Sequence, residues 1–214
     1  MEININFFQI FNIFKIIFAP ESKNLWVTIL WLNIGFCVGS FLNVVIYRLP
    51  IMINIDIENY IAERRNEDLP FLYPFNLILP LSACPKCNKS LKLIQVLPLL
   101  SFLFLKGRCG FCKKKISFQY PLVEFITGLL TAGVVWFYGS NVFGISAVIF
   151  VWFMIILFFI DLNEKILPDE LTVTLMWIGI FFNSFQTYVS LNDSVLGAIL
   201  GYLSLWIVYW VYLI

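Results

Sequence analysis

The sequence predicts an all-α polytopic membrane protein with about five transmembrane helices and a cytoplasmic zinc-binding loop between the first and the second. Three observations predict this class. Of the 214 residues, 61% are apolar and 13% are charged, and the mean hydropathy is +0.89, which is outside the range of soluble domains. Five segments are apolar over the roughly 20 residues that a helix needs to cross about 30 Å of hydrocarbon. Two Cys-x-x-C pairs lie between the first two segments.

The expected spans follow one another closely, except after the first. They cover residues 25–49, 121–139, 142–160, 171–189 and 194–214. Residues 1–20 precede them and are apolar but interrupted by Lys15 and several amides, which predicts an interfacial segment that ends at Pro20. A cleavable signal peptide is disfavoured because Glu2 stands where such a peptide carries basic residues.

The distribution of basic residues sets the expected orientation. Eleven of the fourteen Lys and Arg residues lie between Arg48 and Tyr120. Basic residues close to the ends of spans stay in the cytoplasm, so residues 50–120 are expected to form a cytoplasmic loop, with the N-terminus outside. Residues 121–214 then form a membrane domain of four further spans, and the connection that follows Ile160 is again cytoplasmic.

Composition also excludes several functional classes. The chain contains no histidine, which rules out Ser-His-Asp and Cys-His catalysis and every metal site that uses imidazole. The formal net charge is +1, so no overall attraction to nucleic acid is expected. The partner that the composition does predict is the lipid bilayer.

The four cysteines of the loop predict a zinc site. Cys84 and Cys87 form one pair, Cys109 and Cys112 form the other, and 21 residues separate the pairs. Each pair can turn tightly enough to offer two thiolates to one ion, and a closed four-thiolate site is structural because it leaves no open position. A dithiol oxidoreductase is the alternative, and it needs a pair on the oxidising side. Cys37 lies within the first span and is expected to be a small buried apolar residue.

Carboxylates at the ends of the spans are the candidate catalytic groups. Asp161 directly follows nineteen uncharged residues, so its carboxylate is expected at the membrane rim, partly desolvated, where an acid or base can work near neutrality. The alternative is that Asp161 only ends a span and faces water. Asp169 is a candidate N-cap of the next helix, and solvation at the rim is the favoured interpretation of Glu124.

Small and amide residues predict contacts between helices. Gly35 with Gly39, and Gly197 with Gly201, have the four-residue spacing of close helix packing in lipid. Asn33 and Asn43 lie within the first span and are expected to form hydrogen bonds to other helices.

Several stretches together resemble the type IV prepilin peptidases, which are bifunctional leader peptidases and N-methyltransferases of bacterial inner membranes. The matching text is Gly-Ser-Phe-Leu-Asn-Val-Val-Ile-Tyr-Arg-Leu-Pro at 39–50, Ser-Ala-Cys-Pro-Lys-Cys at 82–87, Cys-Gly-Phe-Cys at 109–112, Tyr-Pro-Leu-Val-Glu at 120–124, Ile-Asp at 160–161 and Leu-Pro-Asp at 167–169. These motifs occur in the order of the family and extend over most of the chain.

The resemblance implies a membrane aspartyl protease of the Gly-x-Gly-Asp type. Such an enzyme removes the basic leader of type IV pilin and pseudopilin precursors at the cytoplasmic face, and methylates the new N-terminal residue from S-adenosylmethionine. By motif, Asp161 is the first catalytic aspartate, and Cys84, Cys87, Cys109 and Cys112 are the zinc ligands. No residue is assigned to the methyl donor.

One family motif is missing from this sequence. The second aspartate of the family lies in a Gly-x-Gly-Asp motif after the fifth span, and that motif occurs nowhere in the 214 residues. The expectation is therefore a truncated or incomplete chain. A non-catalytic membrane scaffold of a pilus or type II secretion system is the alternative from another functional class.

Overall fold

The computed structural model describes residues 24–68, 70, 75–79, 87, 102 and 104–213. The interfacial segment expected over residues 1–20 and the ligand Cys84 lie outside these residues. Within them the secondary structure is helical, apart from a single bridge between Arg108 and Lys115. The helices are α2 (Leu25–Arg65), α4 (Gln119–Tyr138), α5 (Val142–Glu164), α6 (Asp169–Ser184) and α7 (Leu191–Leu213).

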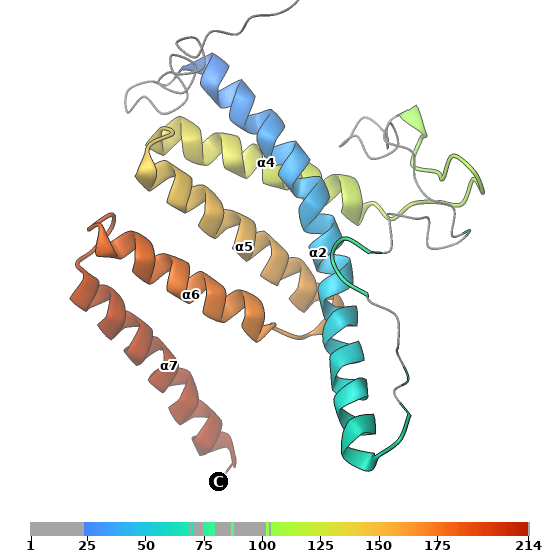
Figure 1. Ribbon diagram of the computed structural model, residues 1–214. Coiled ribbons are helices and arrows are strands. Elements are labelled where there is room, and N and C mark those ends of the chain that lie inside the picture. Colours follow the sequence, from blue (N-terminus) through green and yellow to red (C-terminus); the bar gives the residue numbers. More distant parts are fainter. Residues whose placement is uncertain are drawn as a thin grey trace, which may run out of the picture.

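The helices form a row with one long member lying across it. Helices α4, α5, α6 and α7 each contact the next in the chain, and α2 contacts both α4 and α5 (Figure 1). Four of these helices, α2, α4, α5 and α7, are long and apolar enough to cross a membrane. The predicted helical class is therefore confirmed, with four helices that have the length and composition of membrane spans.

Helix α2 is much longer than the first predicted span. It has 41 residues, or about 62 Å at 1.5 Å per residue, where the sequence predicted an end at residue 49 and a loop from residue 50. Proline usually ends or kinks a helix because it lacks an N–H and crowds the preceding turn. Pro50 instead lies buried inside α2, and the helix changes direction near its middle (Figure 1). Asn66 ends it in a left-handed conformation, donating its N–H to the carbonyls of Ala62 and Glu63.

Helix α6 is shorter than the predicted span of residues 171–189. It has 16 residues, or about 24 Å, which is less than the roughly 30 Å of a hydrocarbon core. Five spans are therefore not confirmed. The remaining predicted spans, 121–139, 142–160 and 194–214, correspond to α4, α5 and α7 with ends displaced by a few residues.

Helices α2 and α4 approach each other closely because glycine lies at the crossing. A Cβ atom added to Gly39 would lie 2.7 Å from the Cα atom of Glu124, and one added to Gly35 would lie 2.8 Å from the Cα atom of Gly128. The predicted packing at Gly35 and Gly39 is thus confirmed. Asn43 also meets its expectation, since its amide donates to the carbonyl of Tyr120 at 2.9 Å.

Three other expectations about these helices do not hold among the described residues. Asn33 donates to the carbonyl of Ile29 in its own helix, at 2.8 Å. Cys37 is exposed on α2. No atom lies within 4 Å of a Cβ added to Gly197 or Gly201 among the residues that the structure describes, and α7 has no buried residue there.

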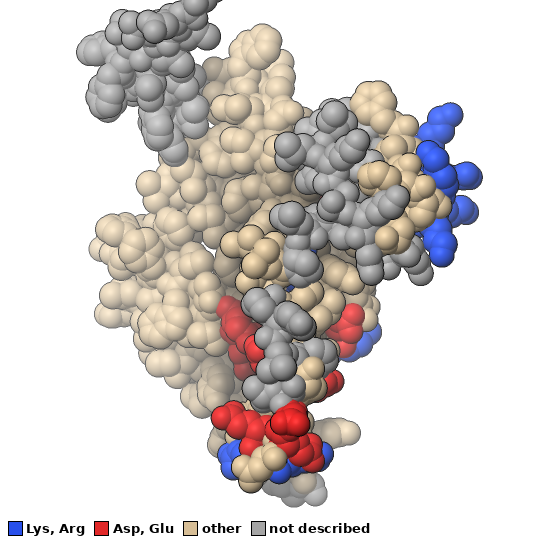
Figure 2. All heavy atoms as spheres, turned by 45° about the vertical axis from the view of Figure 1, so that its right-hand side comes forward, with Lys and Arg blue, Asp and Glu red and all other residues tan. Residues whose placement is uncertain are grey.

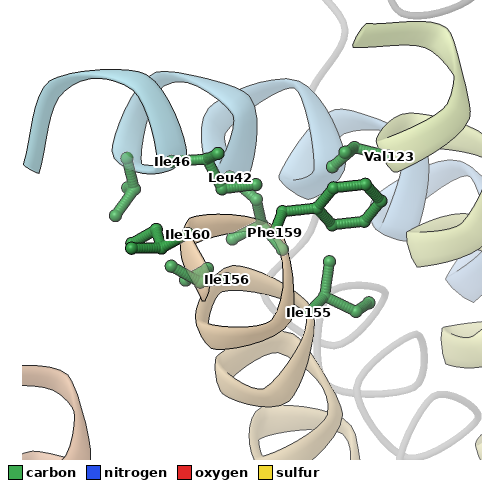
Figure 3. Close-up of a cluster of buried hydrophobic side chains, with 8 residues drawn as sticks. Leu42, Ile46, Val123, Ile155, Ile156, Phe159 and Ile160 are labelled. Carbon is green, nitrogen blue, oxygen red and sulfur yellow. The ribbon is translucent and has the colours of Figure 1, made fainter. Parts of the chain in front are cut away.

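The core lies where α2, α4 and α5 meet. Ile160, at the end of α5, and Val123, near the start of α4, are both fully buried, and both lie against α2 (Figure 3). The buried members of this cluster are Leu42, Val45, Ile46, Val123, Ile155, Ile156, Phe159 and Ile160. A second cluster, nearer the start of α2, contains Val27, Trp31, Val135 and Val148. Between the clusters the indole of Trp152 donates to the hydroxyl of Thr131 at 2.9 Å.

Candidate active site and metal centre

Asp161 lies in the last turn of α5, directly after the fully buried Ile160. The C-cap residue of the helix is Lys165, whose left-handed backbone (φ 59°) lets its N–H donate to the carbonyl of Asp161 at 3.0 Å. The side chain of Asp161 itself is exposed. No described residue covers this carboxylate, so the protein itself does not desolvate it. The buried Ile160 fixes where the backbone of Asp161 lies, and the carboxylate is left accessible.

Further carboxylates lie on the connection between α5 and α6. Glu164 ends α5, and Asp169 and Glu170 form the first turn of α6, where negative charge is favourable beside unpaired backbone N–H groups. Asp169 was a candidate N-cap, but the N-cap is Pro168, which has no side-chain hydrogen bond to the helix. Asp169 is the first helical residue instead.

Glu124 is the site residue for which the sequence favoured the wrong environment. Its side chain is only 9% exposed, and its Cα atom lies against Gly39 of α2. Solvation at the rim is therefore wrong, because the close approach of the two helices encloses the start of α4. Ionisable groups buried within a membrane domain are candidates for function by default, so Glu124 joins the residues with a candidate functional role.

Arg48 is a second buried charge, which the sequence analysis used as a marker of orientation and as part of the motif at residues 39–50. The residue is 7% exposed, and its guanidinium donates to the carbonyl of Asn76 at 2.9 Å and lies 5.8 Å from the centre of the Phe75 ring. The side chain of Asn76 accepts from the N–H groups of Ile78 and Leu79 and so holds a turn. Arg48 thereby fastens residues 75–79 to the middle of α2.

Three cysteine sulfurs meet on the segment that precedes α4. The Sγ atoms of Cys87, Cys109 and Cys112 all lie within 4.8 Å of one another. Tetrahedral zinc with bonds of about 2.3 Å requires sulfurs about 3.8 Å apart. The three thiols therefore fit a metal centre, and the fourth predicted ligand, Cys84, lies outside the described residues.

Backbone hydrogen bonds explain how the second pair is shaped. The N–H of Cys109 donates to the carbonyl of Lys114 at 2.9 Å, and the N–H of Lys113 donates back to the carbonyl of Cys109 at 3.0 Å. Lys113 turns the chain through a left-handed conformation with φ 58°. This tight turn, which we call the knuckle (residues 105–116), points Cys109 and Cys112 toward one centre, and Cys109 is buried.

The structure thus defines a helical, multi-pass membrane protein with a thiol cluster on one connection and an accessible aspartate on another. Two family models match the chain. The bacterial peptidase A24 N-terminal domain matches residues 33–138, which include the knuckle, and the type IV leader peptidase family matches residues 148–214, which include Asp161. The protein belongs to the type IV leader peptidase family.

Curated relatives named prepilin leader peptidase/N-methyltransferase agree with this family assignment. The chain is 45% identical over 187 residues to the prepilin leader peptidase/N-methyltransferase of Pectobacterium carotovorum subsp. carotovorum, covering 84% of this chain and 64% of the relative. It is 42% identical over 182 residues to that of Stutzerimonas stutzeri, covering 85% and 63%. The chain therefore spans less than two thirds of the length of these relatives. No solved structure matches the chain.

Proposed function

We propose that this protein acts in prepilin processing, as a leader peptidase and N-methyltransferase. The substrates would be type IV prepilins and pseudopilins, cut after their basic leader at the cytoplasmic face of the bacterial inner membrane. The observation that carries this proposal is the ordered match of both family models, since the second one includes Asp161. The relatives that match at 42–45% identity carry this double activity in their names.

In the proposed mechanism Asp161 is one half of a pair of aspartates. One carboxylate takes a proton from water, whose oxygen adds to the scissile carbonyl carbon, while the other protonates the carbonyl oxygen. When the C–N bond breaks, the leaving amine takes up a proton from the pair. Asp161 suits this role because it is accessible while the adjacent Ile160 is fully buried, so its backbone position is fixed. The family's second aspartate comes from the Gly-x-Gly-Asp motif, which these 214 residues lack.

We propose a structural role for the metal. Cys87, Cys109 and Cys112 would hold zinc together with Cys84, and four thiolates leave no position open for a substrate. A bound ion would shape the knuckle and would take no part in the cleavage. S-adenosylmethionine would supply the methyl group. No set of described residues is assigned to it, so the methyl transfer is proposed from the relatives' names alone.

The proposed orientation places both candidate sites on one side. Helix α4 begins at Gln119, just after the knuckle, and α5 ends at Glu164, just after Asp161. Two helices joined by the short connection at residues 139–141 run in opposite directions, so these two ends share a side. Clustered Lys and Arg near the start of α4 favour the cytoplasm for that side, which is where a basic leader would remain.

The first prediction tests the catalytic role. In membranes that hold the complete protein and a prepilin, Asp161→Asn should abolish leader cleavage, because an amide can neither accept the proton of water nor return it. Zinc content should be unchanged, because the knuckle is separate from Asp161. Cleavage is followed by the mass shift of the prepilin.

Glu164→Gln is the matched control for this test. It removes one exposed carboxylate from the same end of α5, so a general loss of negative charge would affect both variants equally. The proposed role of Asp161 is overturned if Asp161→Asn cleaves at the normal rate, or if both variants lose activity together.

A further inference from the structure

The knuckle carries a concentration of positive charge with no acidic residue near it in the sequence. Its five cations, Lys106, Arg108, Lys113, Lys114 and Lys115, are all exposed. The sequence has no Asp or Glu between Asp68 and Glu124. Figure 2 shows these cations gathered on one side of the molecule, away from the red carboxylates at the lower end. The described part of this surface therefore carries only positive charges and attracts anions.

Large aromatic side chains lie beside these cations and are also exposed. Phe104 is 82% exposed and Phe118 is 68% exposed. Phenylalanine is ordinarily buried, and aromatic or aliphatic groups that alternate with Lys and Arg are typical of segments that rest in a membrane interface. The surface therefore combines an attraction for negative charge with a preference for an apolar layer.

The chain places this surface at the edge of the membrane domain. Lys115 precedes the start of α4 by four residues, and Phe118 is its N-cap residue. Charges this close to the end of a span lie within about a Debye length of the headgroups, roughly 8–10 Å at physiological salt. An open hollow of about 430 Å³ lies on this surface beside the thiol cluster, and it is lined by Phe104, Leu105, Lys106, Arg108, Cys109 and Lys113. Its volume is large enough for a phosphodiester group with apolar atoms beside it.

We propose that the knuckle docks onto the membrane surface by binding the phosphate groups of anionic phospholipids, with Phe104 and Phe118 at the level of the glycerol backbone. The assignment to the cytoplasmic leaflet rests on the orientation given under the proposed function. The lipid-binding surface itself does not rest on peptidase activity. A basic leader does not fit this surface, because like charges repel.

The test uses the full chain in nanodiscs of phosphatidylcholine that contain a minority of phosphatidylglycerol. Phe104→p-benzoylphenylalanine places a photoreactive group on the surface, and mass spectrometry identifies what it captures. The expected adducts are lipids, with phosphatidylglycerol enriched over its share of the bilayer. Each Lys or Arg near an anionic surface contributes about 1 kcal/mol of attraction. Lys114→Gln with Lys115→Gln should therefore abolish most of this enrichment and bring the ratio of phosphatidylglycerol to phosphatidylcholine adducts close to that of the bilayer.

Two variants serve as controls. Arg64→Gln with Arg65→Gln removes two neighbouring cations at the far end of α2 and should leave the enrichment unchanged. Lys114→Arg with Lys115→Arg keeps the charge and should retain it. Zinc content, measured on every variant, shows that the knuckle has folded.

The proposal is overturned if position 104 captures protein or captures lipids without enrichment. It is also overturned if the substitutions at Arg64 and Arg65 have the same effect, or if inorganic phosphate at constant ionic strength abolishes the enrichment, which would indicate a site for free phosphate. Because nanodiscs expose both faces and contain no prepilin, the result is independent of the cleavage by Asp161 and of the orientation.

Discussion

At the scale of single residues, the crossing of α2 and α4 shows what lipid-embedded packing demands. Gly39 has no side chain, so the Cα atom of Glu124 can approach to 2.7 Å from the place where a Cβ atom would lie. Thr127 and Thr131, both fully buried on α4, lie beside the same glycines. Close approach of backbones, and not the exclusion of water, drives association in a bilayer. The contact at Gly39 therefore leaves no room for even one additional methyl group.

We predict that Gly39→Ala destabilises the protein by about 1–3 kcal/mol, the usual cost of forcing an extra methyl into a packed contact. The contact is with backbone, which cannot rotate away. Unfolding in mixed micelles with increasing denaturing detergent measures the change.

Gly201→Ala is the control, since nothing described lies within 4 Å of its added Cβ. It should be neutral or stabilise α7 by up to about 1 kcal/mol through the better helix propensity of alanine. Equal destabilisation by the two substitutions would contradict the packing at Gly39.

Whether a side chain on a span faces lipid or a neighbouring helix was the feature that the sequence predicted least well. Asn33 and Asn43 both lie in α2, yet one bonds within its helix and the other reaches α4. Cys37 was expected to be buried and is exposed. The reason is physical: lipid-facing and protein-facing sides of a span are equally apolar, so periodicity does not distinguish them. The burial of Glu124 had a partial signal in the sequence, because the small residues Thr127 and Gly128 follow it at the start of α4 and allow another helix to approach.

At the scale of elements, the sequence predicts spans well where length and composition decide. Helices α4, α5 and α7 lie within a few residues of their predicted positions. The continuation of α2 through Pro50 was missed because the packing around a proline, which the sequence does not show, determines whether a helix continues past it. The four cysteines illustrate the opposite case, since their spacing alone predicted that Cys87, Cys109 and Cys112 would meet.

The knuckle gives a prediction at this scale. Cys109→Ser should lower bound zinc to below one ion per chain and increase amide hydrogen exchange over residues 105–116, because metal binding and folding of such a loop are one event. Exchange in α4 and α5 should change little, since their packing is with α2. Elemental analysis and exchange measured by mass spectrometry check both parts.

Cys37→Ser is the matched control for Cys109→Ser. Cys37 is exposed on α2, apart from the thiol cluster, so this variant should bind zinc as the unmodified protein does. Zinc retained by Cys109→Ser, or lost from Cys37→Ser, would refute the assignment of the ligands.

At the scale of the whole molecule, charge is distributed unevenly in a way that a membrane explains. Cations concentrate on the knuckle, and carboxylates gather on the lower part of α2 and at the connection between α5 and α6 (Figure 2). The knuckle and the connection between α5 and α6 lie on one side, where α4 begins and α5 ends. Away from that side the helices expose large apolar side chains, as expected where lipid is the solvent. The proposed orientation assigns the side that carries the knuckle to the cytoplasm.

Thiol labelling from each side of the membrane tests the orientation. A membrane-impermeant maleimide should label the knuckle cysteines in inverted vesicles, and only after a chelator removes zinc, because the coordinated thiolates are protected. Cys37 should stay unlabelled from both sides, since a side chain exposed within a span faces lipid. Labelling of the knuckle in intact spheroplasts would reverse the orientation.

The length of α2 has a mechanical consequence. Arg65 lies fifteen residues beyond Pro50, so the second half of the helix is a rigid arm of about 23 Å. A tilt of about 10° at the proline, where a backbone hydrogen bond is missing, displaces the tip of that arm by about 4 Å. The arm carries Asp56, Glu58 and Glu63 and ends in Arg64 and Arg65. A small change of packing in the membrane half would therefore be amplified into a displacement of this charged tip by several ångströms.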